Sequence, residues 1–201
     1  IHKAFLLTTF LGLPIYRPTL YQSRFYGKSV DKIDEILKDV KEKEEKMDIK
    51  QQMTMHNMMR ILYLKRAESS VYALKKTMEY YLERLFNFDK WLEEEDKIIR
   101  VSNLKGYADM IINDADDDIK KTMEEISINA DPKIYKIDRL KEDINKDKQL
   151  VGIIIDILEK LVKTDDKLDH FVTLLNKFKK ENKKVLVFSY FADTVNFLEN
   201  N

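Results

Sequence analysis

The sequence predicts a mainly α-helical protein in which long antiparallel helices form a bundle and a short strand-helix unit lies at the C-terminal end. Three observations support this fold class. The 201 residues include only four glycines and three prolines, 36% of them are charged, and several long segments carry apolar side chains at helical spacing. A composition this poor in turn residues argues against an all-β architecture.

We expect three parts along the chain. Residues 1–28 contain two prolines and several aromatic residues, and they predict a short helix followed by irregular or extended structure. Residues 29–163 carry helical apolar periodicity, with Ser29 as a plausible N-cap. Residues 164–201 begin with a helix and then change character, which predicts a separate strand-helix unit.

The longest pattern predicts one amphipathic helix from Gln51 to about Asp96. Its apolar residues fall on about one third of the helical circumference: Ile61, Leu64, Val71, Leu74, Met78, Leu82 and Leu85. Four methionines precede them at helical spacing, and we interpret them as adaptable core residues: Met53, Met55, Met58 and Met59. Further helices are expected at 107–128, after Pro132 through Leu161, and from a cap at Thr164 and Asp165 to Glu181.

The last residues predict a strand. Residues 183–189 form a short, nearly continuous apolar run after two lysines, which is typical of a strand buried on both faces of a parallel sheet. Such a strand needs neighbouring strands for its backbone hydrogen bonds. The start at Ile1 and the end at Asn201, inside an apparent helix, suggest that the chain is a piece of a longer protein, with the sheet left in the remainder.

Composition restricts the candidate functions. The 36 basic and 36 acidic residues balance, so any contact with nucleic acid must come from local patches. The chain has no cysteine and its three histidines lie far apart, so we expect no metal site; the acidic run at 114–118 lacks the glycine and glutamate of a calcium loop. The apolar stretch at 4–13 is too short to span a bilayer. A cytoplasmic protein without membrane contact is expected.

Two motifs resemble a known family. The run Asp166-Lys167-Leu168, followed by Lys184-Val185-Leu186-Val187-Phe188-Ser189-Tyr190-Phe191-Ala192-Asp193-Thr194, resembles the opening of the second RecA-like domain of Snf2-like superfamily-2 helicases. Upstream, Leu64-Lys65-Arg66-Ala67-Glu68-Ser69-Ser70 resembles a signature of bacterial members, in the helical region that joins the two RecA-like domains. The C-terminal unit would then be the start of a truncated α/β RecA-like domain.

The resemblance implies that the parent protein is an ATP-dependent DNA helicase or translocase that requires ATP and magnesium. This chain has neither the phosphate-binding loop nor the acidic metal-binding strand that ATP hydrolysis requires, so no cofactor and no catalytic residue is expected in it. We therefore expect a non-catalytic segment that connects the motor domains and helps to position nucleic acid.

Eight residues are candidate nucleic-acid contacts. The resemblance places Ser189, Tyr190 and Thr194 where the family touches the nucleic-acid backbone, with Phe191 interpreted as core. On the predicted long helix, Lys65, Ser69, Tyr72 and Lys76 project on one face with Arg66 beside them, and such a row of cations, a hydroxyl and a ring can follow a phosphate backbone. A solvated face with local ion pairs, for example between Glu68 and Lys65 or Arg66, is the alternative.

A second functional class stays open at this point. Methionine-rich and leucine-rich stripes also fit a helical scaffold that dimerises or binds a protein partner. The predicted strand leads to a related expectation, because an unpaired strand at 185–189 is most simply covered by a second copy of the chain, giving a homodimer.

Overall fold

The computed structural model describes residues 2–27, 33–99 and 127–200. The helix expected at 107–128 and the acidic run at 114–118 therefore lie almost entirely outside the described residues; only 127 and 128 are described, and both belong to a strand.

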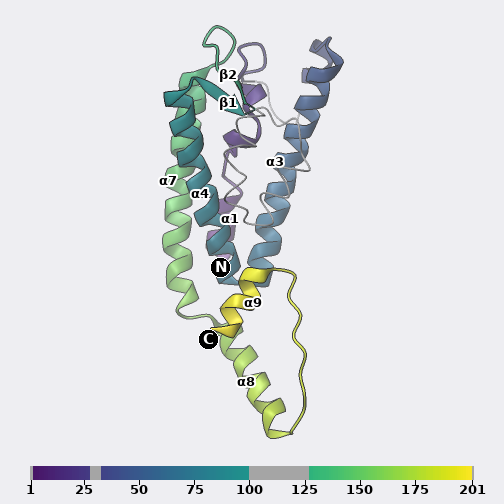
Figure 1. The fold of residues 1–201 in the computed structure, drawn as a ribbon, viewed down its shortest axis with the longest axis vertical. Coiled ribbons are helices and arrows are strands. Elements are labelled where there is room, and N and C mark those ends of the chain that lie inside the picture. The colour runs from purple at the N-terminus through teal and green to yellow at the C-terminus, as the bar shows by residue number, and fades with distance from the viewer. Residues whose placement is uncertain (1, 28–32, 100–126, 201) are drawn as a thin grey trace. The chain divides into compact units, whose positions relative to one another are not determined.

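The mainly α-helical fold class is confirmed (Figure 1). The helices are α1 (His2–Thr8), α2 (Ile33–Asp39), α3 (Lys43–Ser69), α4 (Val71–Glu94), α7 (Ile137–Val162), α8 (Asp166–Lys180) and α9 (Ala192–Glu199). Short 3-10 helices at Pro14–Tyr16 and Pro18–Tyr21 follow α1. Two short strands that the sequence did not predict, β1 (Lys97–Ile99) and β2 (Ser127–Asn129), pair antiparallel with Ile98 opposite Ile128.

The single helix predicted from Gln51 to Asp96 is wrong, because the chain turns at Ser70 and forms α3 and α4. Ser70 N donates to the carbonyl oxygen of Arg66 at 3.1 Å and so ends α3. Its hydroxyl oxygen accepts from Ala73 N at 2.9 Å, and its carbonyl accepts from Leu74 N at 3.2 Å. Serine is a preferred N-cap because its side chain satisfies an amide that the first helical turn leaves unpaired. Ser70 therefore starts α4.

The described chain separates into two compact units. The first unit comprises Ile1–Leu11, Arg60–Glu83 and Gln149–Asn201. Within it, the C-terminal end of α3 and the N-terminal end of α4 fold back on each other as a hairpin, and the buried rings of Tyr63 and Tyr81 meet across it with centroids 6.3 Å apart. The buried residues of this unit also include apolar side chains from α1, α4 and α7: Ala4, Leu74, Met78, Val151, Ile154 and Leu158.

The second unit comprises Gly12–Met59 and Arg84–Lys148. Here the buried carboxylate of Asp147 on α7 accepts hydrogen bonds from the backbone amides of Gly12 and Leu13, both at 2.8 Å. These bonds hold Leu13 in the left-handed region, at a φ of 52°. Lys148 on α7 pairs with Asp89 on α4, and Lys141 lies 3.6 Å from Glu93, so the two helices run antiparallel in this unit.

The interpretation of the methionines as core residues is confirmed in the second unit. Met53, Met55 and Met59 are buried, and Met58 is half-buried. Four other buried residues of this unit pack together as an apolar cluster: Phe25, Ile36, Val40 and Ile49.

The strand predicted at 183–189 does not form. These residues have no regular secondary structure, and Leu186 and Phe188 are 84% and 88% exposed. A strand exists only with a partner to accept its backbone hydrogen bonds, and none of the described residues supplies one. The flanking elements agree with the prediction: α8 starts after Asp165, whose side chain accepts from Lys167 N and Leu168 N, and α9 follows at Ala192.

Within the described parts of the chain, no helix has the length and apolar character needed to cross a membrane. The predicted boundaries at residues 28 and 163 stay predictions.

Tyr21 gives a pH-dependent test of the second unit. Its hydroxyl donates to Asp143 Oδ2 at 2.8 Å. Burial, followed by this hydrogen bond, raises the pKa of Tyr21 far above its usual value of 10.0. Because the folded-state pKa is raised, the stabilisation that Tyr21 contributes is complete below about pH 10 and is lost as the pH rises above that value.

We expect Tyr21→Phe to lower the free energy of unfolding by about 1 kcal/mol at pH 7. The variant should also show a shallower fall in stability above about pH 10 than the unmodified chain, because the unfolded state of the variant has one phenol fewer to ionise. Urea denaturation across this pH range measures both effects. Tyr190→Phe, at a ring that is 86% exposed, is the matched control. Identical pH slopes for Tyr21→Phe and the unmodified chain would contradict the assignment.

Candidate nucleic-acid interface

The eight candidate residues all lie in the first unit, around the turn between α3 and α4. We call this turn, residues 66–72, the α3–α4 corner. The row predicted on one helix is divided between two: Lys65 and Ser69 belong to α3, whereas Tyr72 and Lys76 belong to α4. The single face expected from helical spacing is therefore corrected, because Ser70 changes the direction of the chain.

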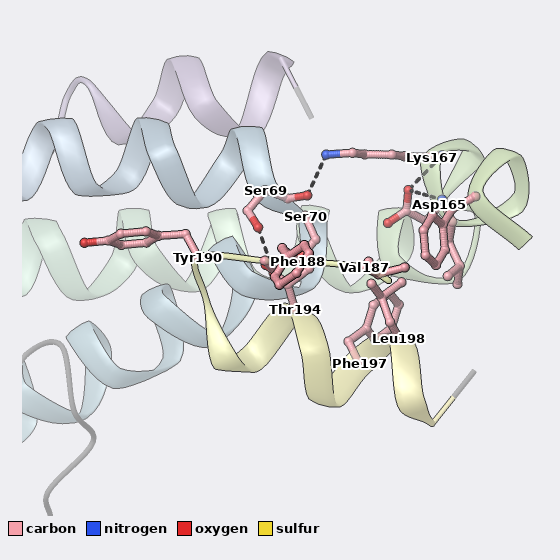
Figure 2. Close-up of a pocket in the computed structure, with 13 residues that line it drawn as sticks. Ser69, Ser70, Asp165, Lys167, Val187, Phe188, Tyr190, Thr194, Phe197 and Leu198 are labelled. Atoms are coloured by element: carbon pink, nitrogen blue, oxygen red, sulfur yellow. Dashed lines mark hydrogen bonds between the residues drawn. The ribbon is translucent and has the colours of Figure 1, made fainter. Parts of the chain in front are cut away.

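Lys167 binds the end of α3. Its Nζ donates to the carbonyl oxygen of Glu68 at 2.7 Å and to that of Ser69 at 2.6 Å, and Figure 2 shows the second bond. The last carbonyls of a helix lack intrahelical partners, and a cation there also interacts favourably with the helix dipole. Lys167 comes from the first turn of α8, which Asp165 caps. The N-terminus of α8 is thus attached to the C-terminus of α3.

Arg66 is a buried cation that binds the start of α9. Its guanidinium forms an ion pair with Asp193, and both side chains are largely removed from solvent, at 7% and 15% exposure. The guanidinium carbon also lies 4.2 Å from the ring centroid of Phe191. Phe191 itself is buried, in agreement with its interpretation as a core residue. A planar guanidinium suits both contacts, because its N–H groups donate to a carboxylate in its plane while a ring packs against its face.

Hydroxyl groups make a second link between the corner and α9. Ser69 Oγ lies 2.8 Å from Thr194 Oγ1, and Ser70 Oγ lies 3.2 Å from the same atom. Thr194 is buried. Figure 2 shows these side chains pointing toward one another beneath Lys167.

An aromatic contact is a third link between the α3–α4 corner and α9. The ring of Tyr72 stacks on the ring of Phe197 in α9, with centroids 4.7 Å apart and planes 11° apart. Lys76 Nζ lies 5.8 Å from the centroid of Tyr72 and 3.0 Å from Glu79 Oε2. The hydrogen bond to Glu79 raises the pKa of Lys76 above its usual value.

The three remaining candidates are closer to solvent. Lys65 is exposed and forms no ion pair with any described residue. Tyr190 is 86% exposed and meets Phe191 edge-on, with centroids 5.1 Å apart. Ser189 is half-buried and forms a local turn, in which its hydroxyl accepts from the Phe191 amide at 3.3 Å.

A groove of about 310 Å³ opens beside the corner. It is formed by the start of α8, the residues before α9, and α9 itself, and Figure 2 shows the side chains around it. Its polar edge carries Ser69, Ser70, Thr194, Asp165 and Lys167, and the remainder of its lining is mainly apolar. Among the described residues no cluster of acidic or histidine side chains fits a metal ion.

The sequence analysis missed the roles of Lys167, Asp193 and Phe197. Lys167 and Asp193 both lie inside the two motifs. Two features of the sequence could have drawn attention to them: Lys167 is a cation in the first turn of a predicted helix, and Asp193 is an acid that follows a predicted strand. Periodicity alone cannot show that these residues meet Arg66 and Ser69, because the partners are separated by about 100 residues or more.

No family model, curated protein or solved structure matches the chain. The resemblance to Snf2-like helicases therefore stays a prediction, supported by the motifs themselves.

The buried ion pair can be measured by a double-mutant cycle on the 201-residue chain. We expect Arg66→Met to lower the free energy of unfolding by about 3 kcal/mol, because it leaves the Asp193 carboxylate poorly solvated and without its counter-charge. Asp193→Leu should cost a similar amount for the converse reason. The double variant should cost clearly less than the sum of the two single changes, with a coupling energy of about 1–3 kcal/mol.

Urea denaturation followed by circular dichroism provides these energies. The matched control is the exposed pair Arg139 and Glu142, which is 2.7 Å apart with side chains 58% and 45% exposed. Its cycle should give a much smaller coupling than that of Arg66 and Asp193, because both charges stay in water and are screened. Additive effects of Arg66→Met and Asp193→Leu would show that the contact does not attach α9 to the corner.

Proposed function

We propose that the chain is a non-catalytic segment of an Snf2-like, ATP-dependent DNA helicase or translocase, which connects the two motor domains and positions nucleic acid. One observation carries the proposal. The two sequence motifs that resemble this family are separated by about 100 residues or more, yet they meet at the α3–α4 corner through Arg66–Asp193, Ser69–Thr194 and Lys167 with the carbonyls of Glu68 and Ser69.

This meeting gives the two motifs a shared physical role. In the proposed parent, α9 and α8 belong to the start of the second RecA-like domain and the α3–α4 hairpin belongs to the helical region that joins the domains. A buried ion pair and two short contacts to backbone carbonyls fix one arrangement, because removing either partner leaves a charge without compensation. The joint then transmits a displacement of the second domain to the helical hairpin.

The contacts divide the eight candidates into two groups. Arg66, Ser69 and Thr194 have polar partners inside the protein, so we assign them the positioning of the interface. The second group is open to solvent: Lys65 and Tyr190 are exposed and Lys76 is partly exposed. We propose that the two lysines contact the phosphate backbone and that the ring of Tyr190 contacts a base. Tyr72 and Ser189 support this second group through the stack on Phe197 and the turn before α9.

The scaffold alternative loses one of its two surfaces. Met53, Met55 and Met59 are buried within the second unit, so these three side chains are not exposed to a partner. In its other basis, the leucine-rich stripe, Leu74 and Leu85 are buried and Leu64 is 40% exposed. The related expectation of a homodimer through residues 185–189 is considered separately below.

DNA binding by the 201-residue chain tests the proposed contacts. We expect fluorescein-labelled single-stranded and duplex DNA to bind at micromolar concentrations in low salt. Lys65→Glu should weaken binding roughly five- to tenfold and lower the salt dependence by about one counter-ion, because it removes one phosphate contact. Lys90→Glu, at an exposed lysine of α4 in the second unit, is the control and should leave affinity unchanged.

Fluorescence anisotropy over a series of salt concentrations gives both quantities. An equal loss of affinity in Lys65→Glu and Lys90→Glu would mean that only general charge matters, and no binding at tens of micromolar would remove the nucleic-acid role of this segment.

The motor assignment has an independent test in the gene. The coding sequence upstream should specify a phosphate-binding loop with its lysine, and the sequence downstream should specify the arginine motif of the second domain. A coding sequence with neither motif would contradict the motor assignment even if the chain binds DNA.

A further inference from the structure

The segment 184–190, between α8 and α9, presents an ordered row of apolar side chains to solvent. Leu186, Phe188 and Tyr190 are 84%, 88% and 86% exposed, whereas Val185 and Val187 between them are 41% and 48% exposed. This alternation has the period of an extended chain, in which successive side chains point to opposite sides. Figure 1 shows the segment as a long stretch without helix or strand.

The backbone of this segment has unused hydrogen-bonding capacity. No backbone amide or carbonyl of residues 184–190 bonds to the backbone of another described residue. The bonds of Lys183 N to Phe178 O at 3.0 Å, and of Thr194 N to Phe191 O at 3.1 Å, flank the segment and do not enter it. An extended apolar stretch with free backbone groups is a template for strand pairing.

We propose that the segment pairs with the same segment of a second copy of the chain, as two antiparallel strands centred on Val187. In this register Val187 lies opposite Val187 of the second copy, Leu186 lies opposite Phe188, and Lys184 lies opposite Tyr190. The contact is isologous, because both copies use the same residues. It does not rest on the proposed function in DNA binding, but it shares Tyr190 with that proposal, so DNA and a second copy of the chain would compete for this ring.

The sequence of the segment favours this register over the alternatives. Antiparallel pairing on Val187 places an aliphatic side chain opposite an aromatic one, and a cation opposite a tyrosine ring, which are favourable cross-strand pairs. Parallel pairing in register would place Lys183 and Lys184 beside their own copies, and like charges opposite each other are destabilising. Self-complementarity in the antiparallel direction therefore selects a second copy as the partner.

The expected affinity is moderate. A two-stranded pair alone is marginally stable, so part of the stability must come from the cross-strand contacts of Leu186 with Phe188 and of Lys184 with Tyr190 on one face of the pair. We expect a dissociation constant in the micromolar range, and therefore a dimer at tens of micromolar.

Engineered cysteines test the register, because the chain has no cysteine of its own. Residues directly opposite in an antiparallel pair have Cα atoms about 4.5–5.5 Å apart, which suits a disulfide. Val187→Cys should therefore give a disulfide-linked dimer under mild oxidation. Leu186→Cys lies diagonal to its own copy, at a Cα distance of roughly 7 Å or more, and should cross-link several-fold more slowly even though residue 186 is more exposed. Cross-linking that follows exposure, with Leu186→Cys as fast or faster, overturns the register.

Sedimentation equilibrium tests the dimer itself. The unmodified chain should dimerise at tens of micromolar, and Phe188→Lys should weaken dimerisation at least tenfold because it places a charge in the apolar row. Leu174→Lys, at a leucine of α8 that is 47% exposed, is the control and should dimerise normally. Circular dichroism checks that each variant keeps its helices. A monomeric unmodified chain at 100 micromolar, or a Phe188→Lys variant that dimerises as strongly as Leu174→Lys, overturns the proposal.

Discussion

The contacts of the first unit depend on how the unpaired backbone carbonyls at the end of α3 obtain hydrogen-bond donors. A helix leaves its last carbonyl groups without intrahelical partners, and here α3 ends at Ser69 and only Ser70 separates it from α4. Ser70 N bonds the carbonyl of Arg66, and so short a connection supplies no backbone amide to the carbonyls of Glu68 and Ser69. Lys167 supplies two hydrogen bonds from a different helix. The polar requirement of one helix end therefore determines where the N-terminus of α8 is attached.

The buried charge of Arg66 imposes the next constraint. Desolvation of a guanidinium is costly, so its side chain requires an anion and a surface that tolerates its face. Asp193 and Phe191 provide both from adjacent positions at the start of α9. Such a pair contributes little net stability compared with apolar packing, but a shift of α9 by one residue would leave the charge without its partner. The pair therefore selects one position of α9, and the bond between Ser69 and Thr194 agrees with that position.

The sequence predicted those elements that depend on interactions between residues close together in the chain, such as helical periodicity and capping. The stripe of α7, the Asp165 cap of α8 and the position of α9 follow from periodicity and capping. The turn at Ser70 was missed because serine is tolerated inside helices, and because Leu64 and Val71, about two helical turns apart, would lie on the same face of a continuous helix. The strand at 183–189 was predicted from residue type, but its formation requires neighbouring strands that no described residue provides. Likewise, the candidate residues could be chosen from the sequence, whereas their partners across the fold could not.

The exposed row at 184–190 follows from how its two ends are held. At the end of α8, Asn182 adopts a left-handed φ of 53°, and the amides of Asn182 and Lys183 bond back to the carbonyls of Lys179 and Phe178. This arrangement is a Schellman motif, which stops the helix and directs the chain away from it. At the other end, Phe191 and the residues after it are fixed to the α3–α4 corner. Because both ends are fixed, the segment between them cannot fold over its own apolar side chains. Its exposure is therefore a consequence of the contacts that order α8 and α9, and a variant that releases α9, such as Arg66→Met, should weaken dimerisation as well as stability.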